Sequence, residues 1–163
     1  GGGIMPITGI ICKPKLWVQE IIDNPWLLGS PTFGGNPVCC AAALATIKYM
    51  LEHDIPGVCK RKGEVLKAGL EALGKKMAAR AVKIIQAVRG LGLLLAVEFH
   101  TSEMGYACAK GMFARKVLTA GTLVNAKTIR FEPAAVISEQ DIQDVLSRMD
   151  EALADTQKAF GLE

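Results

Sequence analysis

The stretch from Gly29 to Ala45 contains residue types that could bind an anion. Ser30 and Thr32 supply hydroxyl groups just before a pair of glycines and the dipeptide Asn36-Pro37. Asn36 is a favoured N-cap and Pro37 suits the first helical position, so a tight loop leading into a helix is predicted. Because a helix N-terminus carries partial positive charge, hydroxyl groups beside it favour a phosphate. A well-capped buried helix behind a turn would have the same sequence, and both interpretations stay open.

Arg130 is the second candidate for binding chemistry. It alternates with the apolar residues Ile129 and Phe131 in a predicted short strand, so its side chain should leave the opposite face from theirs. A guanidinium held on a strand beside Pro133 can bind a carboxylate through two parallel hydrogen bonds. A surface ion pair is the alternative interpretation of this arginine.

The sequence shows no standard catalytic constellation. His53 and His100 stand at the ends of predicted elements without a serine or cysteine partner at a recognisable spacing, so surface positions are expected for both. The cysteines lack Cys-x-x-Cys or Cys/His ligand spacing, which predicts reduced, buried thiols and no metal site. They are Cys12, Cys39, Cys40, Cys59 and Cys108.

Composition limits the classes of partner. The 163 residues carry a net charge of +3 that is dispersed along the chain, so no nucleic acid is expected as a partner. Half of the residues are apolar, which suggests surface that is buried against another chain or a missing domain. No apolar run reaches the ~18 residues of a membrane span and no signal peptide is visible, so we expect no membrane contact and a cytoplasmic location.

The elements expected before residue 55 do not close into a unit by themselves. The apolar residues 4–12 predict a buried strand, and Pro14 begins a short helix to about Ile22 with apolar residues facing inward. The capped helix is expected to run from Pro37 to about His53. Its inward stripe is expected at Leu44, Ile47 and Leu51.

Residues from about 80 onward predict a self-contained α+β domain, an antiparallel sheet with helices on one face. A glycine-containing turn over 89–92 joins two of its strands, and Ser138 to Asp141 resembles a capping box. A long helix over 56–79 is expected just before this domain. Within the domain the expected elements, in chain order, are strands over 84–88 and 93–99, a helix over 102–117, strands over 122–125 and 128–131, and a helix over 138–160.

Three motifs in this order resemble a known family. They are Gly-Gly-Gly-Ile-Met-Pro-Ile at 1–7, Thr-Phe-Gly-Gly-Asn-Pro at 32–37 and Ala-Lys-Thr-Ile-Arg-Phe-Glu-Pro at 126–133. Over essentially the whole chain the sequence resembles the C-terminal part of class III pyridoxal-phosphate-dependent aminotransferases. It is most similar to putrescine aminotransferases, with ornithine and 4-aminobutyrate aminotransferases as near relatives.

The resemblance implies an α/β protein, the C-terminal part of a fold-type I pyridoxal-phosphate-dependent transferase. Residues 1–55 would be a remnant of the large cofactor-binding domain, and residues 56–80 a connecting helix. Residues 81–163 would be the small C-terminal α+β domain with its antiparallel sheet.

The resemblance also implies roles for individual residues. Thr32 matches a threonine that reaches the cofactor phosphate of the neighbouring subunit, and Gly2 and Gly3 would lie beside the cofactor. Arg130 matches the arginine that holds the substrate carboxylate. The lysine that forms a Schiff base with the cofactor would lie upstream of Gly1, so no catalytic residue is expected in this chain.

For the parent protein, the resemblance implies transfer of an amino group from a diamine or ω-amino compound such as putrescine to 2-oxoglutarate. Pyridoxal 5'-phosphate would be the cofactor, and the protein would be a homodimer with shared active sites. The chain alone is expected to bind no cofactor and to be inactive. A noncatalytic association module or an anion-binding module is the alternative.

Overall fold

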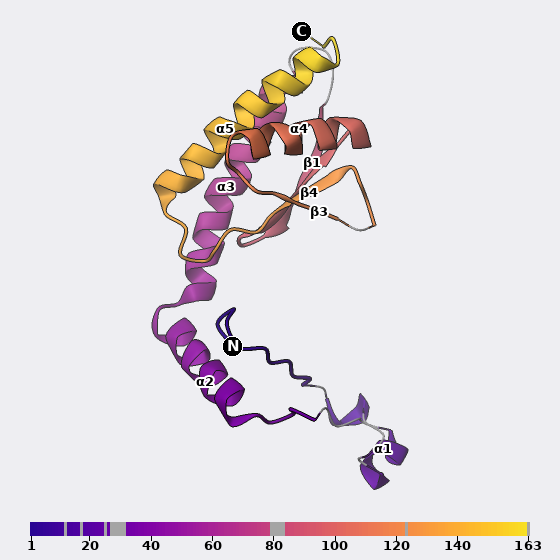
Figure 1. The fold of residues 1–163 in the computed structure, drawn as a ribbon, viewed down its shortest axis with the longest axis vertical. Coiled ribbons are helices and arrows are strands. Elements are labelled where there is room, and N and C mark those ends of the chain that lie inside the picture. The colour runs from indigo at the N-terminus through magenta and orange to yellow at the C-terminus, as the bar shows by residue number, and fades with distance from the viewer. Residues whose placement is uncertain are drawn as a thin grey trace. The chain divides into compact units, whose positions relative to one another are not determined.

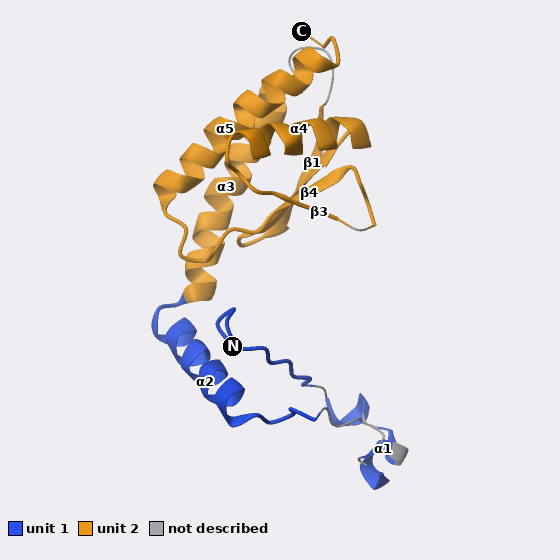
Figure 2. Cartoon of the chain, viewed as in Figure 1, with its two compact units in different colours: residues 1–54 blue, residues 55–163 orange. Residues whose placement is uncertain are grey.

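The computed structural model describes residues 1–11, 13–16, 18–24, 26, 32–78, 84–122 and 124–162. Figure 1 shows the order of the elements along the chain. The chain divides into two compact units, which we call unit 1 (residues 1–54) and unit 2 (residues 55–163) (Figure 2). No helix among the described residues is both long enough and apolar enough to cross a membrane.

The apolar segment at residues 4–11 forms no strand, so the predicted buried strand over 4–12 is wrong. Ile4, Ile10 and Ile11 are 86%, 91% and 102% exposed. A strand is held by hydrogen bonds to a neighbouring strand, and unit 1 contains none among its described residues. Within the described part of unit 1 the segment therefore has no strand to pair with, and Cys12 lies outside that part.

Two short pieces replace the predicted helix from Pro14 to Ile22. They are the 3-10 helix η1 (Pro14–Leu16) and the helix α1 (Gln19–Asp23). Leu16 and Ile22 are exposed instead of facing inward, and Trp17 lies outside the described residues. Helices this short bury too little surface to be held by packing.

Helix α2 (Pro37–Glu52) forms where the sequence predicts it. The Asn36 side chain accepts hydrogen bonds from the N–H groups of Val38 at 3.0 Å and Cys39 at 3.3 Å, which satisfies two amides of the first turn. The expectation of an inward stripe is wrong, and none of the 16 described residues of α2 is buried. The residues expected to face inward, Leu44, Ile47 and Leu51, are 55%, 54% and 75% exposed.

Unit 2 begins with the long helix α3 (Ile55–Ala78), which the sequence predicts over 56–79. Asp54, just before it, has a φ of +45°, and this left-handed residue separates α3 from the preceding helix. Leu66, Leu70 and Met77 are buried at helical spacing, as predicted. Along this stripe α3 packs against the sheet and against the last helix of the chain.

The sheet of unit 2 is antiparallel, in the order β1-β2-β4-β3. Its strands are β1 (Ile85–Leu91), β2 (Leu94–Phe99), β3 (Ala120–Gly121) and β4 (Thr128–Phe131). The predicted antiparallel pair is confirmed, although its turn is shorter than expected because Leu91 still pairs with Leu94. Gly92, in that turn, has a φ of +59°, a conformation that favours glycine.

The strand predicted over 122–125 is wrong. Thr122, Val124 and Asn125 form no strand, and Leu123 lies outside the described residues; the Thr122 hydroxyl accepts a hydrogen bond from the Asn125 N–H at 3.1 Å. Short polar side chains of this kind compete with strand pairing by bonding to nearby backbone. The strand in this region is β3, which pairs Ala120 with Arg130 on β4.

The helices α4 (Ser102–Ala114) and α5 (Glu139–Ala159) complete unit 2 (Figure 1). Helix α4 ends earlier than the predicted residue 117, and Lys116 just beyond it has a φ of +64°. The Ser138 hydroxyl caps α5 by accepting a hydrogen bond from the Asp141 N–H at 3.0 Å, which confirms the predicted helix start. Helices α3 and α4 pack against the sheet, and α5 packs against α3 and α4. The core that they form includes Leu95, Val97 and Phe99 of β2.

Candidate functional site

Thr32 opens the turn that leads into α2. Its side chain is exposed, and within the described part of the chain its hydroxyl has no hydrogen-bond partner. Gly35 has a φ of +70°, and the Asn36 N–H donates to the Phe33 carbonyl at 3.2 Å, which closes the turn. Because the Asn36 side chain already occupies two amides of the first helical turn, the open group for an anion is the Thr32 hydroxyl rather than the helix end.

Gly2 and Gly3 lie in a turn that is closed by two N–H groups donating to the Gly1 carbonyl at 3.1 and 3.0 Å. Their φ angles are +66° and +79°, which L side chains rarely adopt. A Cβ at Gly2 would lie 3.0 Å from the Thr46 hydroxyl of α2, whereas nothing lies within 4 Å of a Cβ at Gly3. The turn therefore lies close to α2 at Gly2, whereas the backbone at Gly3 is open to a ligand.

A cavity of about 270 Å³ lies in unit 1 beside this loop. One wall is the segment Pro6 to Thr8, and the other is formed by residues 33–36 with Cys39 and Cys40. None of the described residues that line it is charged. An anion in this cavity would therefore depend on hydroxyl and backbone N–H groups.

Arg130 lies on β4 in unit 2, and its direction agrees with the predicted alternation. Ile129 and Phe131 are buried, whereas the Arg130 side chain is 43% exposed. Its neighbours across the sheet are the small residues Ala96 on β2 and Ala120 on β3. With no bulky side chain directly opposite, the guanidinium is free to extend beyond the sheet.

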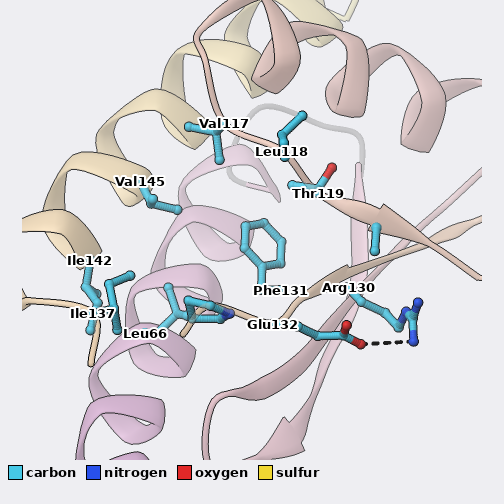
Figure 3. A pocket seen from close by; sticks show the side chains of 12 residues that line it. Leu66, Val117, Leu118, Thr119, Arg130, Phe131, Glu132, Ile137, Ile142 and Val145 are labelled. Carbon is cyan, nitrogen blue, oxygen red and sulfur yellow. Dashed lines mark ion pairs between the residues drawn. The ribbon is translucent and has the colours of Figure 1, made fainter. Parts of the chain in front are cut away.

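Arg130 forms an ion pair with Glu132. Arg130 Nη1 lies 2.9 Å from Glu132 Oε1, and Figure 3 shows the two side chains reaching toward each other. The Glu132 side chain is 38% exposed, so the pair is in contact with water. The surface ion pair, left open as the alternative interpretation of Arg130, is therefore present, but it uses only part of the donor set of the guanidinium.

The ion pair lies at the edge of a second cavity of about 270 Å³. Among the described residues that line this cavity, Arg130 and Glu132 are the charged ones. The rest of the wall is largely apolar: it includes Leu66 of α3, Phe131 of β4 and Val145 of α5 (Figure 3). Such a cavity suits a ligand with an aliphatic portion and a charged end.

Sequence reasoning missed Glu132 and Lys62 as parts of this site. Glu132 stands two residues after Arg130, a spacing that places both side chains on one face of an extended chain, so a signal was present. Lys62 of α3 donates from Nζ to the Ile137 carbonyl at 2.5 Å and lies 3.5 Å from the Ala135 carbonyl. It holds the loop after Glu132, and no local pattern reveals so distant a contact.

The predicted site residues are divided between the two units. Gly2, Gly3 and Thr32 belong to unit 1, and Arg130 belongs to unit 2. Among the described residues, no group of three or more His, Cys, Asp or Glu side chains could hold a metal ion.

Comparison with known proteins identifies the family of the chain. The family model described as Aminotransferase class-III matches residues 1–153. A crystal structure of acetylornithine aminotransferase from Elizabethkingia anophelis is 25% identical with a TM-score of 0.69, and the match covers 77% of this chain and 32% of that one.

Two further solved structures are similar in fold. Ornithine aminotransferase from Toxoplasma gondii is 24% identical with a TM-score of 0.68, covering 80% of this chain and 30% of that one. Lysine aminotransferase from M. tuberculosis is 23% identical with a TM-score of 0.72, covering 84% and 31%. The chain thus spans about a third of the length of the solved structures it matches.

The described helices and antiparallel sheet are those of the C-terminal portion of a fold-type I pyridoxal-phosphate-dependent aminotransferase, as expected. The family model spans nearly the whole sequence. The chain belongs to the class III aminotransferase family.

Proposed function

We propose that this chain forms part of the active site of a pyridoxal-phosphate-dependent aminotransferase. The donor would be a diamine or another ω-amino compound, with putrescine as the type expected from the sequence, and the acceptor would be 2-oxoglutarate. The observation that carries the proposal is Arg130, an exposed guanidinium at the edge of a largely apolar cavity, on a strand that is paired on both sides. The homodimer and the cytoplasmic location expected from the sequence are parts of the same proposal.

The residues of unit 1 fit the phosphate group of the cofactor. The exposed Thr32 hydroxyl has no partner among the described residues, so it can donate a hydrogen bond to a phosphate oxygen. The space beside Gly3 is open, which allows a flat ring to approach the backbone. When bound, pyridoxal phosphate supplies the electron sink for amino-group transfer.

Arg130 would bind and orient the acid substrate. Its fork of donors can hold a carboxylate through two parallel hydrogen bonds, which fixes the position and the direction of the carbon chain. The strand pairs with β2 and β3 on its two sides, so the guanidinium is carried by a supported part of the sheet. Thr32 would bind and position the phosphate, while Arg130 sets which carbon of the substrate is presented.

The role of Arg130 is tested by titrating 2-oxoglutarate into the full 163-residue chain and into the Arg130→Gln variant. We expect the variant to lose about tenfold in affinity, because a charge-assisted bidentate contact becomes a single neutral one. Isothermal titration or chemical-shift changes of the side-chain N–H groups measure the binding constant.

Arg89→Gln is the matched control. Arg89 is also a half-exposed arginine of this sheet and is paired with Glu98, but it does not line the cavity at Arg130. Its removal should leave the affinity for 2-oxoglutarate unchanged. Equal affinities in the native chain and in Arg130→Gln would contradict the proposed carboxylate site.

The phosphate contact has its own test. Inorganic phosphate should shift the amide signals of Thr32 and Gly35, and the Thr32→Val variant should weaken this effect. If the shifts spread evenly over the basic residues instead, the contact at Thr32 is ruled out.

An association module is the second candidate, because α2 exposes apolar side chains. Leu44, Ile47 and Leu51 are each more than half exposed although they share the helix with small residues suited to close packing. Light scattering over a range of concentrations decides between the candidates: a tight dimer without any binding of 2-oxoglutarate favours association alone.

A further inference from the structure

Unit 2 contains another cavity, of about 520 Å³, which is bounded by α4, by the end of β3 and by the start of β4; we call it the α4 cavity. Strand β3 ends at Gly121, which pairs with Ile129, so Thr128 lies just beyond the last pair of these two strands. None of the described residues that line the α4 cavity also lines the cavity at Arg130. Its volume is that of a site for a small organic molecule.

Thr128 lines the α4 cavity, and its hydroxyl group makes no hydrogen bond within the described part of the chain. The residue is 3% exposed. A buried hydroxyl in this state is unfavourable, because it has given up its bonds to water without gaining others. Rotation about χ1 alone changes the direction of a threonine hydroxyl. Thr128 can therefore offer its full hydrogen-bonding capacity to a group in the cavity without movement of the backbone.

The rest of the wall is suited to a flat ring. Tyr106 of α4 is 74% exposed, and its aromatic side chain lines the cavity. Ala109 and Ala126 are small, so a ring can approach both α4 and the chain that leads into β4. Offset or edge-on contact between two aromatic rings adds to the free energy gained by burying apolar surface.

Glu103 determines which charge a ligand can carry, because it is the charged residue among the described ones that line the α4 cavity. A hydrogen bond from its own backbone N–H, and then one from the Thr101 hydroxyl, lower the pKa of its carboxyl, so Glu103 is ionised at neutral pH. An anionic ligand is repelled by this carboxylate. The Thr128 hydroxyl needs no charged partner, and the cavity therefore favours a neutral ligand.

We propose that the α4 cavity binds a small neutral aromatic molecule that carries a hydroxyl group, such as a simple phenol. The ring lies against Tyr106, and its hydroxyl forms a hydrogen bond with the Thr128 hydroxyl. This site goes beyond the proposed function, because it uses none of the residues assigned to the cofactor or to the acid substrate.

Phenol and toluene separate the contribution of the hydroxyl group from that of the ring. The two molecules have nearly the same shape, but toluene forms no hydrogen bond. Each is titrated into the full 163-residue chain, and the binding constant is taken from the shifts of the Gly105 amide and Ile129 methyl signals. We expect phenol to bind about fivefold more tightly than toluene. Benzoate should bind at least about threefold more weakly than phenol, because its charge meets that of Glu103.

Two substitutions at Thr128 test the hydrogen bond. Thr128→Val removes the hydroxyl at nearly constant shape, so the affinity for phenol should fall about fivefold, to the level of toluene, while the affinity for toluene stays unchanged. Thr128→Ser keeps the hydroxyl and should keep the preference for phenol. Tyr106→Ala should weaken both ligands by the same factor, because it removes the ring contact that they share.

Thr156→Val is the matched control. Thr156 is also buried, but its hydroxyl donates to the Ala152 carbonyl at 2.8 Å. Its loss should lower the urea midpoint and leave both affinities unchanged, whereas Thr128→Val should leave the midpoint unchanged or raise it.

The outcomes decide for or against the α4 site. Equal binding of phenol and toluene by the native chain overturns the proposal. It is also overturned if both valine variants lose phenol affinity, or if Thr128→Val lowers the urea midpoint as much as Thr156→Val does, because the Thr128 hydroxyl then has a structural role. A loss of the preference for phenol that is confined to Thr128→Val supports the proposal.

Discussion

Cys108 shows how burial removes the reactivity of a side chain. It is fully buried in α4, with its sulfur 3.6 Å from the Met149 sulfur, and this burial raises the pKa of its thiol from 9.0 to about 12. At pH 8 the thiolate fraction therefore falls from about one in ten to about one in ten thousand. Because the pKa is raised, the thiol's contribution to stability is complete below pH 9.0 and is lost as the pH rises toward 12.

A thiol reagent at pH 8 should therefore modify Cys40 and Cys108 at very different rates. Cys40 is exposed and should react at once, whereas Cys108 should react only as fast as unit 2 unfolds. The Cys108→Ala variant should lack the slow phase, which identifies it. Modification of Cys108 at the rate of Cys40 in the native chain would show that the core at α4 is open.

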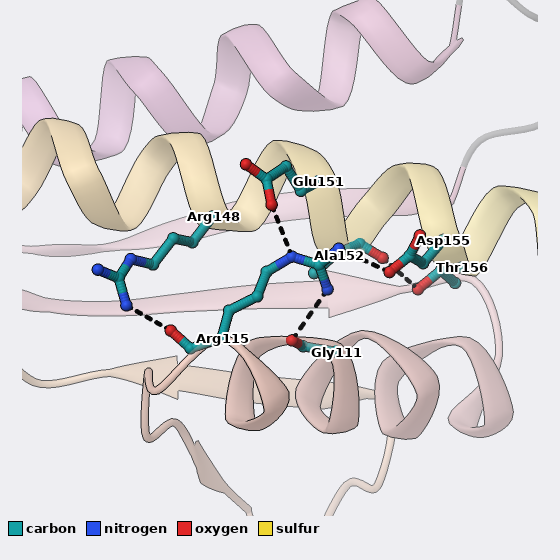
Figure 4. Close-up of polar contacts among 7 residues, drawn as sticks. All are labelled: Gly111, Arg115, Arg148, Glu151, Ala152, Asp155 and Thr156. Carbon is teal, nitrogen blue, oxygen red and sulfur yellow. Dashed lines mark hydrogen bonds and ion pairs between the residues drawn. The ribbon is translucent and has the colours of Figure 1, made fainter.

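Arg115 joins two helices through a network of contacts (Figure 4). It lies 2.9 Å from Glu151 and 2.7 Å from Asp155 on α5, and it donates to the Gly111 carbonyl of α4 at 3.1 Å. The hydrogen bonds to Glu151 and then to Asp155 raise the pKa of its guanidinium, so it stays charged over the whole working range. One arginine thus binds two carboxylates of α5 and a carbonyl group near the end of α4.

Replacing Arg115 with alanine should lower the free energy of unfolding by about 1–2 kcal/mol, more than a single surface pair gives, because one ordered side chain makes several bonds. The urea midpoint of the full chain measures the change. Lys76→Ala is the control, since it breaks an exposed pair with Asp150 and should cost less than about 0.5 kcal/mol. Equal losses in both variants would show that the Arg115 network adds nothing.

At the scale of elements, α3 and the β1–β2 turn approach each other at Gly63. A Cβ at this position would lie 1.8 Å from the Gly92 carbonyl oxygen, closer than two atoms can come, so the backbone must move. Gly74 lies on the same helix, where a Cβ would meet Ile85 at an ordinary 3.5 Å. The helix therefore has no space for a Cβ at Gly63 but does have space for one at Gly74.

Gly63→Ala should lower the free energy of unfolding by about 2–3 kcal/mol, because overpacking outweighs the better helix propensity of alanine. Gly74→Ala should leave stability unchanged or raise it by up to about 1 kcal/mol. Thermal or urea unfolding of the two variants compares them directly. A stabilised Gly63→Ala variant would mean that the turn lies farther from α3 than the structure shows.

Helices were easier to predict from the sequence than their surroundings. Asn36-Pro37 and Ser138 give local signals, and α2 and α5 begin where these signals stand. The prediction of a strand over 4–12 was wrong because an apolar pattern indicates which residues favour burial but not which element covers them. For the site, alternation predicted the direction of Arg130, whereas the partner role of Glu132 requires knowing which neighbour the guanidinium selects.

At the scale of the whole molecule, the two units differ in how many apolar side chains they bury. Every buried apolar residue among those described belongs to unit 2, where three helices and one sheet form a core. Helix α2 of unit 1 has its N-cap and helical hydrogen bonds but no buried side chain. Because most helical stability in proteins comes from packing of an apolar face, α2 should open far more readily than the helices of unit 2.

Amide hydrogen exchange followed by mass spectrometry measures this difference. Peptides from α2 should exchange within about a minute, whereas peptides from α5 around Met149 and Leu153 should stay protected about a hundredfold longer or more. Exchange is measured at several protein concentrations, because a second copy that covers Leu44 and Ile47 would slow α2 only at high concentration. Protection of α2 equal to that of α5 at the lowest concentration would show that α2 is stable without a covering surface, and its exposed apolar face would then need another explanation.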